Sequence, residues 1–580
     1  MTSPTSESAI DPDLAALLGS AGVPAPYAVR AADRLGERAA ALLRADPWRL
    51  LRVPGVRPEQ ADHFAGRVLA QQGEQARAED VRRGRALVVH VLTEAARRGH
   101  TAMTPRAVVS ALGALGVPDP SRAIEAALEE AEVVTLLEEA EFDPLAEEDE
   151  PPEPQESLGL SRYALAEEAA AEGLQRLSAT AEPLLPDETV RALRADLPED
   201  RALALTAAAR TGVSVLHGAP EEVEQTAVAI ARALASCDVP VALAACTATG
   251  ARSLGEGAVG LYELLEAARP PGAPAGVVGF GRGEQRPLEA AAVVVPDAGA
   301  LDVEAAAALV EACGDGTHLV LGGDPAALPP SGPGRVLADL AASETVPVIE
   351  LEAAAHGQPA GFLAAVRRGE LPAVRPPGRE VVIVPARAEE EAVHRAVQIV
   401  TDSIPRALRI APQDVQVVTP LAGGRAGAAA LNAALKAHLN PGPGVCGGFD
   451  PGDRVIAAAP VAGVAAGEHG TVTAASPSGL RVAFGTGREP VEVPATALPR
   501  LRHGWAAPVA LARAARYPAV VAVIPQEAAS ALSRPLAVTA FGLARRHLSV
   551  VHTAGPALAR AVRENLGSPR ETRLPRLMRQ

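Results

Sequence analysis

The sequence is poor in aromatic residues, in cysteine and above all in lysine. Phe, Trp and Tyr make up 2% of the 580 residues, so the hydrophobic cores must rely on Ala, Leu and Val. Lys436 is the only lysine, and arginine supplies the other positive charges. The cysteines are scattered, with no CxxC pair and no histidine cluster, which argues against a disulfide framework and a zinc site and fits a reducing cytoplasm. They are Cys237, Cys246, Cys313 and Cys446.

Long apolar runs are also missing. No run approaches the ~20 residues that a membrane-spanning helix needs, and the opening "MTSPTSESAIDPDL" is too acidic and polar for a secretory signal. We therefore expect a cytoplasmic protein without a membrane partner. The length of 580 residues exceeds what one core supports, and 48% hydrophobic with 21% charged residues is typical of globular chains.

The charge argues against a general nucleic-acid binder, since the formal net charge is −16. Its distribution is uneven, however. Residues 123–157 hold 14 acids and no Lys or Arg, whereas residues 534–580 hold 9 Arg against 2 acids. This asymmetry leaves room for a local polyanion site.

The first 145 residues are almost entirely helical in pattern. In "LLRVPGVRPEQADHFAGRVL" (50–69), two apolar helical segments flank a glycine turn. A helix-hairpin-helix presents backbone N–H groups of such a turn to a DNA phosphate without reading bases. An ordinary helical turn explains the segment equally well. The DNA-binding candidates are Val53, Gly55, Val56 and Arg57.

From about residue 186 onward, short apolar runs alternate with helical segments. Two such series predict two parallel α/β domains, and the glycine-rich stretch at 452–494, with short period-2 runs, predicts a small β-barrel inserted into the second. We expect a multi-domain α/β protein with these segments: 1–80, helix-hairpin-helix region; 81–143, winged-helix-like helical bundle; 144–160, Pro-rich acidic linker; 161–375, first α/β domain; 376–448 and 501–580, second α/β domain; 449–500, inserted β-barrel.

"SVLHGAPEEVEQTAVAIARAL" (214–234) predicts a buried strand, a turn and a helix. A turn of this kind often cradles phosphate, yet it carries Glu221, Glu222 and Glu224 where an anion site needs glycines and a lysine. Acids at the first helical turn suit the helix dipole, and they could accept the N–H bonds that a phosphate would take.

The order of segments resembles that of RecD-like superfamily 1 DNA helicases. "HLVLGGDPAALPPSGPGRVLADL" (318–340) is similar to the family's "LVGDxxQLPxVGxGxVLxDL", and "LSRPLAVTAFGLARRHLSVVH" (532–552) is similar to its "LxYTAxTRAxxxLxLV". The resemblance covers nearly the whole chain. It implies two RecA-like domains, ATP and magnesium as cofactors, and DNA as the substrate.

The phosphate-binding motif GxxxxGK[ST] is degenerate in this chain. Val223 replaces the second glycine, Glu224 the lysine and Gln225 the hydroxyl residue. At an effective dielectric of ~20 and ~4 Å a unit charge pair is worth about 4 kcal/mol, so the reversal costs on the order of 8 kcal/mol, which equals micromolar binding. The degenerate nucleotide-binding positions are Gly218, Ala219, Pro220, Glu221, Glu222, Val223, Glu224 and Gln225, with Arg201 where the family has its adenine-reading Gln.

Other catalytic positions of the family are also replaced. The metal-binding acidic pair aligns with Pro296 and Asp297, so one carboxylate remains. The Gln of the third motif aligns with Ala327, and the arginine finger, worth ~10³–10⁵ in rate, aligns with Leu543. The DNA-contacting "TVHKSQGSE" aligns with "PVALARAAR" (508–516), and the Arg of "PTGRAA" with Thr249, whereas the acid at Asp324 is kept.

Three further patterns have simpler explanations. "GFGRGEQ" (279–285) follows no clear strand and opens no helix, which favours a surface hairpin over a dinucleotide loop. Asp297 and Asp302 lie five residues apart across a turn, which favours a motif remnant over a metal pair. Arg545, Arg546 and His547 are equally consistent with a phosphate grip and with a solvated helix end. His90, His100 and His356 receive no role.

Together these patterns predict a RecD-like helicase homologue that has lost ATP hydrolysis and is retained as a DNA-associated or protein-binding scaffold. We expect no intact catalytic residue, no metal and no cofactor, weak sequence-independent DNA binding, and other proteins as further partners. Two alternatives stay open. One is a working ATP-dependent 5′→3′ DNA helicase in recombination or repair, and the other is a decaying gene product without a role.

Overall fold

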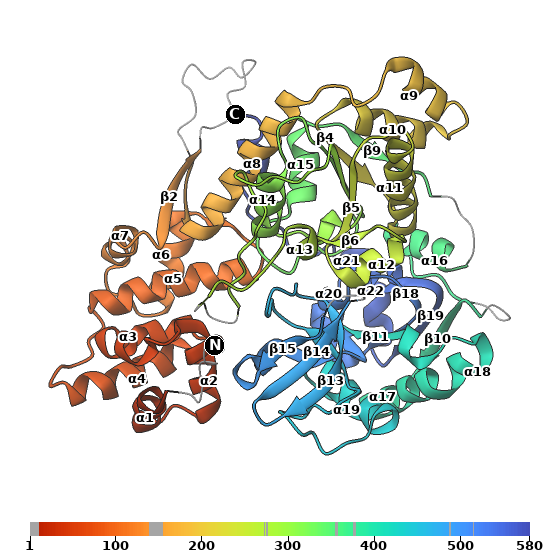
Figure 1. The fold of residues 1–580 in the computed structure, drawn as a ribbon. Coiled ribbons are helices and arrows are strands. Elements are labelled where there is room, and N and C mark those ends of the chain that lie inside the picture. The colour runs from red at the N-terminus through yellow and green to blue at the C-terminus, as the bar shows by residue number, and fades with distance from the viewer. Residues whose placement is uncertain are drawn as a thin grey trace, which may run out of the picture.

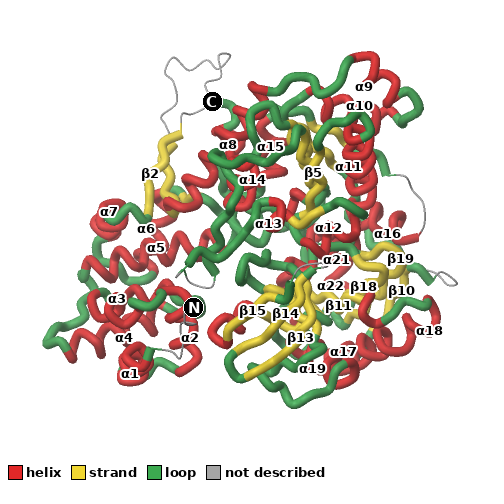
Figure 2. Tube along the Cα trace, viewed as in Figure 1, coloured by secondary structure: helices red, strands yellow, loops and turns green. Residues whose placement is uncertain are grey.

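The fold is that of a computed structural model, which describes residues 11–138, 155–271, 273, 276–353, 358–374, 379–485, 489–513 and 515–580. The described chain holds two parallel sheets flanked by helices, two antiparallel sheets and a helical N-terminal region (Figure 1; Figure 2). This arrangement confirms the expected multi-domain α/β class. His356 and residues 144–154 lie outside the described residues.

The N-terminal region is a small helical unit, drawn in red at the left of Figure 1. Its core includes Trp48 and Phe64, whose side chains are 1% and 0% exposed. Its elements are α1 (Pro12–Ser20), α2 (Ala25–Leu35), α3 (Ala39–Ala45), the 3₁₀ turn η1 (Pro47–Arg52) and α4 (Pro58–Gln71).

The next unit combines three helices with a small antiparallel sheet of order β1-β3-β2. The chain order is helix, strand, helix, helix and two paired strands. Its elements are α5 (Val81–Arg97), β1 (Ala102–Met103), α6 (Pro105–Ala114), α7 (Pro120–Glu129), β2 (Val133–Glu138) and β3 (Gln155–Leu160).

The expected linker at 144–160 needs correction, because its last six residues form β3. β3 pairs antiparallel with β2, with Val133 opposite Leu160 and Leu136 opposite Ser157. Leu158 and Leu160 are buried against the helices, which gives this strand a reason to fold back. The acidic, proline-rich stretch therefore connects two paired strands of one unit.

The first parallel sheet has the order β6-β5-β7-β8-β4-β9. Its central strands β4, β7 and β8 are buried along their whole length, as parallel strands covered on both faces should be. Its elements are α8 (Ser161–Thr180), α9 (Asp187–Arg194), α10 (Glu199–Arg210), β4 (Val213–His217), α11 (Pro220–Ala235), β5 (Val241–Ala245), α12 (Ala248–Leu254), β6 (Val259–Gly260), α13 (Leu261–Leu264), β7 (Ala292–Val295), α14 (Val303–Ala312), β8 (His318–Gly323), α15 (Val336–Ser343) and β9 (Val348–Glu350).

The second parallel sheet has the order β10-β19-β18-β11-β17. Its elements are β10 (Val381–Pro385), α17 (Glu389–Gln398), a π-helical turn (Ile399–Ser403), α18 (Ile404–Leu408), β11 (Val415–Thr419), α19 (Ala428–Leu439), β17 (Ala506–Pro508), α20 (Val509–Ala512), β18 (Tyr517–Ile524), α21 (Arg534–Gly542), β19 (Ala544–His552) and α22 (Pro556–Glu564). The two series of short apolar runs that the sequence shows from about residue 186 onward form strands of the two parallel sheets.

The insertion is an antiparallel sheet of order β15-β14-β13-β12-β16. Within the described residues its strands pair in a linear order, with β15 and β16 at the two ends, and they occupy the place of the expected small inserted β-barrel. Its elements are β12 (Arg454–Ala457), β13 (His469–Ser476), β14 (Gly479–Phe484), β15 (Val491–Pro494) and β16 (Leu501–His503).

The expected domain boundaries place two helices with the wrong parallel sheet. α16 (Gln358–Arg367) places Phe362 and Val366 in the core of the second sheet, although we expected it with the first. α23 (Leu574–Leu577) places Leu574 in the core of the first sheet. Within the described ranges, no helix combines the length and the hydropathy that crossing a membrane requires.

Candidate functional site

The turn predicted to be a degenerate phosphate loop joins β4 to α11. β4 lies between β8 and β9 in the first sheet, and the loop consists of Gly218 and Ala219. α11 begins at Pro220, because proline suits the first helical position. The N–H of Gly218 donates to the carbonyl of Gly323 at 3.2 Å. The loop is thus short and bonded to its own sheet.

Val223, at the position of the motif's second glycine, points into the core. Its side chain is 0% exposed, and its Cγ1 atom lies 2.4 Å from where a Cβ on Gly322 would stand. The absence of a side chain at Gly322 therefore makes space for Val223 against β8. Apolar packing closes this side of the turn, where a phosphate loop would leave room for its anion.

Glu222, at the start of α11, belongs to a cluster of ion pairs with Arg201 and Asp200. Its carboxylate is paired with the guanidinium of Arg201, which also pairs with Asp200. Asp200 in turn accepts the N–H of Glu352 at 2.9 Å. Arg201 occupies the position that the resemblance assigns to the adenine-reading residue, and its guanidinium is held by two carboxylates.

Glu224, at the position of the motif lysine, binds two arginines from the second sheet. Its Oε2 atom accepts from Nη2 of Arg545 at 2.9 Å and from Nη1 of Arg516 at 3.2 Å. Arg516 also lies 3.5 Å from Oε2 of Glu221. The Arg516 side chain is 10% exposed and that of Glu224 is 20% exposed. These ion pairs connect α11 to the strand ends of β18 and β19.

These contacts correct two expectations about the acids. The cost of placing phosphate beside Glu224 assumed an unpaired carboxylate, but two guanidiniums neutralise it. We also expected the acids to accept N–H groups of the loop. In the described chain, the carboxylates of Glu221 and Glu224 accept instead from arginine side chains, and Glu221 also accepts from Gln225 at 3.3 Å.

Asp297, the single acid left at the metal-binding position, is bonded to the backbone. Both carboxylate oxygens accept the N–H of Cys246 at 3.0 Å. Burial raises the pKa of Asp297 to about 6, and the nearby Glu224 adds to the effect. Pro296, beside it, is buried and carries no second carboxylate. Asp302 caps α14 by accepting the N–H of Ala305 at 2.9 Å, which agrees with the motif-remnant interpretation.

Asp324 is also held by protein groups. It forms a 3.0 Å ion pair with Arg367 and accepts the N–H of Ala326 at 2.9 Å. Burial raises its pKa. Leu543, at the arginine-finger position, is 4% exposed and belongs to the core of the second sheet, while Ala327 lies at the edge of that core. Neither position presents a polar group.

Two separate cavities lie between the two parallel sheets beside the turn at Gly218, and Pro220 and Arg516 stand between them. A cavity of about 100 Å³ is lined by Glu224, Asp297 and Asp324, and a separate cavity of about 430 Å³ is lined by Glu221 and Glu222. Pro220 and Arg516 line both. Ligand pockets for small molecules usually span ~300–1,000 Å³, so the side that holds the remnant acids is small for a nucleotide.

Arg545, Arg546 and His547 do not lie at a helix end, as one interpretation supposed. They belong to β19. Arg545 is paired with Glu224, and the buried ring of His547 contacts the carbonyl of Arg379 at 2.6 Å. Only Arg546 is exposed. Arg545, which one interpretation assigned to phosphate binding, therefore binds the carboxylate of Glu224 instead.

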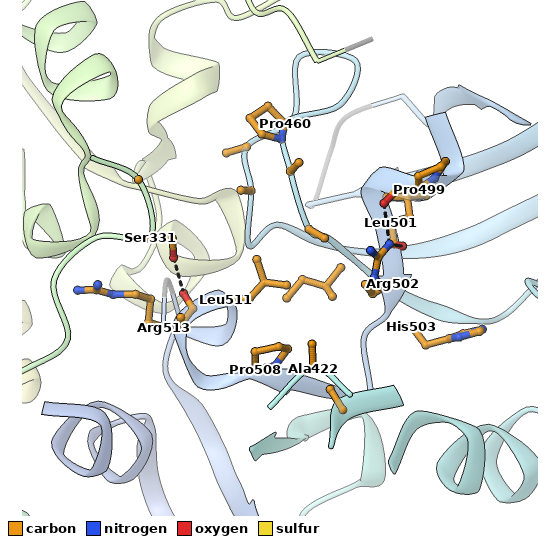
Figure 3. A pocket seen from close by; sticks show the side chains of 18 of the residues that line it. Ser331, Ala422, Pro460, Pro499, Leu501, Arg502, His503, Pro508, Leu511 and Arg513 are labelled. Carbon is orange, nitrogen blue, oxygen red and sulfur yellow. Dashed lines mark hydrogen bonds between the residues drawn. The ribbon is translucent and has the colours of Figure 1, made fainter. Parts of the chain in front are cut away.

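The segment expected to contact DNA, residues 508–516, borders a cavity of about 1140 Å³ between the two sheets, the insertion and α2. Figure 3 shows Arg513 and Arg502 on opposite sides of it, among mostly apolar side chains. Arg513 donates to the carbonyls of Pro329 and Gly299, and burial lowers its pKa to about 10. Ser331 donates to the carbonyl of Ala510 at 3.2 Å.

Two other sequence patterns receive plain structural roles. Residues 279–285 form bridges typical of hairpins, with Gly279 opposite Ala268 and Gly283 opposite Arg286, as favoured over a dinucleotide loop. Thr249 donates its N–H to Glu468 of the insertion at 3.1 Å.

The hairpin at residues 53–56 exposes its tip and buries its flanks. Val53 and Val56 are 1% and 6% exposed, so their side chains serve the core. Gly55 has a φ of 89°, a conformation that favours glycine, and Arg57 is exposed beside it. The hydroxyl of Tyr27 donates to the carbonyl of Gly55 at 3.1 Å.

Sequence reasoning missed a second glycine turn of the same kind. Gly22, with a φ of 76°, and Val23 join α1 to α2. The two turns lie together, because Gly22, Val23 and Val56 line one hollow of about 200 Å³. The signal was the repeated Gly-Val pair, which is followed within two residues by a proline, at the N-cap of α2 (Pro24) and at the first position of α4 (Pro58).

Comparison with known proteins places this region in a family. Residues 10–102 match the model of the "ATP-dependent RecD2 DNA helicase HHH domain". For residues 10–102 the match confirms the resemblance to RecD-like helicases, and it extends beyond the expected boundary at residue 80 to include α5.

Solved structures with a similar arrangement are more distant. The Pif1 helicase from Bacteroides in complex with ADP-AlF3 and ssDNA has 13% identity, with 63% of this chain and 92% of that chain covered at a TM-score of 0.35. The Pif1 helicase from Candida albicans has 15% identity, with 63% and 94% covered at 0.30. The Arterivirus nonstructural protein 10 helicase has 11% identity, with 73% and 71% covered at 0.25. Such distant likenesses assign no role to any residue here.

Proposed function

We propose that this RecD-like chain is a helicase homologue that neither binds nor hydrolyses ATP and that acts as a DNA-associated or protein-binding scaffold. The observation that carries the proposal is the pairing of Glu224 with Arg516 and Arg545. The residue in the lysine position is an anion, and the two nearest cations of the second sheet are already bound to it.

The surrounding groups support the same conclusion. The guanidinium of Arg201 is held by Asp200 and Glu222. Asp297 accepts a backbone N–H, and the residue before it in the sequence is Pro296 and not a second acid. A nucleotide would have to break these ion pairs and supply none of the missing catalytic groups. Since breaking a buried pair costs ~3–5 kcal/mol, a substantial part of the affinity would be lost.

The alternative is a working ATP-dependent 5′→3′ DNA helicase, which the family assignment of residues 10–102 favours. A nucleotide titration separates the two. Purified full-length protein is titrated with a fluorescent ATP analogue and Mg²⁺, and phosphate release is followed with and without single-stranded DNA. We expect neither binding nor release. DNA-stimulated turnover that disappears in Gly218→Val or Asp324→Asn would establish the helicase instead.

The scaffold role requires that the chain still contact DNA or another protein. The exposed tip at Gly55 and Arg57 supports weak, sequence-independent contact with phosphates, because a backbone turn reads no bases. A chain that binds no DNA and retrieves no protein partner would favour the remaining alternative, a product without a role.

A further inference from the structure

Five arginines surround one cavity on the N-terminal side of the molecule. The cavity has a volume of about 340 Å³ and lies where η1, α2 and α5 meet the start of α8. The arginines that line it are Arg34, Arg49, Arg52, Arg85 and Arg162.

Two carboxylates line the same cavity and neutralise part of this charge. Asp46 accepts from Nη2 of Arg85 at 2.6 Å and from Nε of Arg49 at 3.3 Å. Glu132 is paired with Arg52. Asp46 is therefore shared between two guanidiniums.

Two further acids bind the outer sides of the arginines. Glu130 lies 2.6 Å from Nη1 of Arg85, and Glu304 binds Arg162 through two contacts of 2.6 and 3.1 Å. Five guanidiniums thus meet four carboxylates. His90, which also lines the cavity, adds no charge at neutral pH because burial lowers its pKa.

Arg34 is the guanidinium without a carboxylate partner within the part of the chain that the structure describes. Burial and repulsion from Arg162 and Arg500 lower its pKa. The pKa of Arg52 is lowered in the same way, by burial and then by Arg49. Cations that repel one another in a partly desolvated space are stabilised by an added anion.

The remaining donors suit a phosphoryl group. A guanidinium carries five N–H donors in a planar fork, and Arg49 uses one of them on Asp46. Arg–phosphate contacts are charge-assisted and often bidentate. The Tyr163 ring, with the Arg162 guanidinium 4.5 Å from its centroid, adds a flat surface to the wall. The volume also lies within the range of ligand pockets.

We propose that this arginine-lined cavity binds a phosphoryl group, supplied either by a nucleic-acid backbone or by a free pyrophosphate compound. It is distinct from the hairpin tip at Gly55 and from the degenerate loop at Gly218, since neither residue lines it. Its position near α8 places the bound anion between the RecD2-type region and the first parallel sheet.

Arg34→Glu tests the site, because Arg34 lines the cavity and forms no ion pair within the described residues, so its replacement breaks none. Full-length protein is titrated by calorimetry with inorganic pyrophosphate and, separately, with a single-stranded DNA oligonucleotide. We expect binding of at least one probe, weakened at least tenfold by Arg34→Glu and several-fold by Arg49→Gln. The matched control Arg563→Glu changes an arginine that is 69% exposed on α22 and should bind as the unchanged chain does.

The two probes distinguish the sources of the phosphoryl group. Binding of pyrophosphate that depends on Arg34 identifies a free ligand, and binding of DNA alone with the same dependence identifies a backbone. Arg57→Glu, at the hairpin, should leave the affinity for pyrophosphate unchanged, which separates this site from the proposed DNA contact there. Absence of binding by the unchanged chain, or equal affinities in Arg34→Glu, would overturn the proposal.

Discussion

The carboxylate of Glu224 accepts a 2.9 Å hydrogen bond from Nη2 of Arg545, and through it α11 of the first sheet is tied to β19 of the second. Arg516 adds a second tie at 3.2 Å. Because these contacts join side chains of the protein itself, they connect the two sheets without a bound ligand.

The first prediction concerns the strength of this bridge. Glu224→Arg places a third cation beside Arg516 and Arg545, and we expect it to lower the free energy of unfolding by more than the ~1–3 kcal/mol that a charged hydrogen bond contributes. Thermal melts at low salt measure the effect. Combining it with Arg545→Glu should restore part of the loss, because the swapped pair attracts again.

Glu188→Gln is the matched control for this prediction. Glu188 is an exposed first-turn carboxylate of α9 in the same unit, and its removal should shift the midpoint little. If Glu224→Arg melts as the unchanged chain does, or if the swap brings no recovery, the ion pairs do not hold the two sheets together.

A second prediction concerns rebuilding the phosphate motif with Val223→Gly, Glu224→Lys and Gln225→Thr. ATPase activity should not return, since Pro296 and Leu543 remain. The triple variant should also be less stable without nucleotide. Val223 is fully buried, so its loss leaves a void and puts glycine into a helix, at a cost on the order of 3 kcal/mol. Lys at 224 would in addition face two arginines.

A thermal melt in nucleotide-free buffer measures this, with Glu224→Lys alone as the control that separates charge from packing. The triple variant should melt below the single variant. An unchanged or higher midpoint would show that neither the carboxylate nor the valine stabilises the turn, and recovered ATPase activity would show that the remaining site is competent.

The third prediction concerns the hairpin. Full-length protein should bind duplex DNA weakly at low salt, without sequence preference and with an affinity that falls as salt rises. Arg57→Glu should weaken this binding and lower the slope of log K against log salt by about 1. Arg67, an exposed arginine farther along α4, serves as the control through Arg67→Glu. Equal losses in both variants would point to general charge and not to the hairpin.

The fourth prediction is a pH dependence centred on Glu167. This side chain is 1% exposed and accepts the N–H groups of Arg573 at 2.8 Å and Leu574 at 3.2 Å. Burial raises its pKa to about 7 from 4.5. Its contribution to stability is therefore fully present below pH ~4.5 and is lost as the pH rises through about 7, by about 3 kcal/mol at most.

Denaturant unfolding at several pH values between 4.5 and 7.5 tests this prediction. Stability should fall over this range, and Glu167→Gln should flatten the fall because the amide stays neutral while its oxygen still accepts. Glu172→Gln, an exposed change on the same helix, should leave the profile as it is. A profile that Glu167→Gln does not alter would assign the pH dependence to other groups.

The strands were predictable from the sequence because parallel strands are buried on both faces and appear as short apolar runs, such as the one that forms β18. The path of residues 155–160 could not be predicted from the sequence. Proline and acids made the stretch look like a linker, and the pairing that makes it a strand depends on β2, more than fifteen residues earlier. Composition describes a segment and does not locate its partner.

The candidate site shows the same limit more sharply. The replacement of lysine by Glu224 was visible in the sequence, but its partners Arg516 and Arg545 lie 292 and 321 residues away. Both arginines stood in segments already noted for other reasons. Only the fold brings the three residues together. In the sequence Glu224 looked like a charge that repels phosphate, whereas in the fold its carboxylate forms ion pairs that join the two sheets.

The contact of Glu167 with residues 573 and 574 cannot form until both residues have been synthesised. Its first backbone partner follows 406 residues later. At ~5–20 residues per second, a ribosome needs about 20–80 s to cover that distance. During this interval α8 has emerged without the two backbone N–H groups that the Glu167 carboxylate accepts in the fold, so its packing is complete only once residues 573 and 574 have been made. A nascent chain halted before residue 573 should therefore be open to proteases and chaperones at α8.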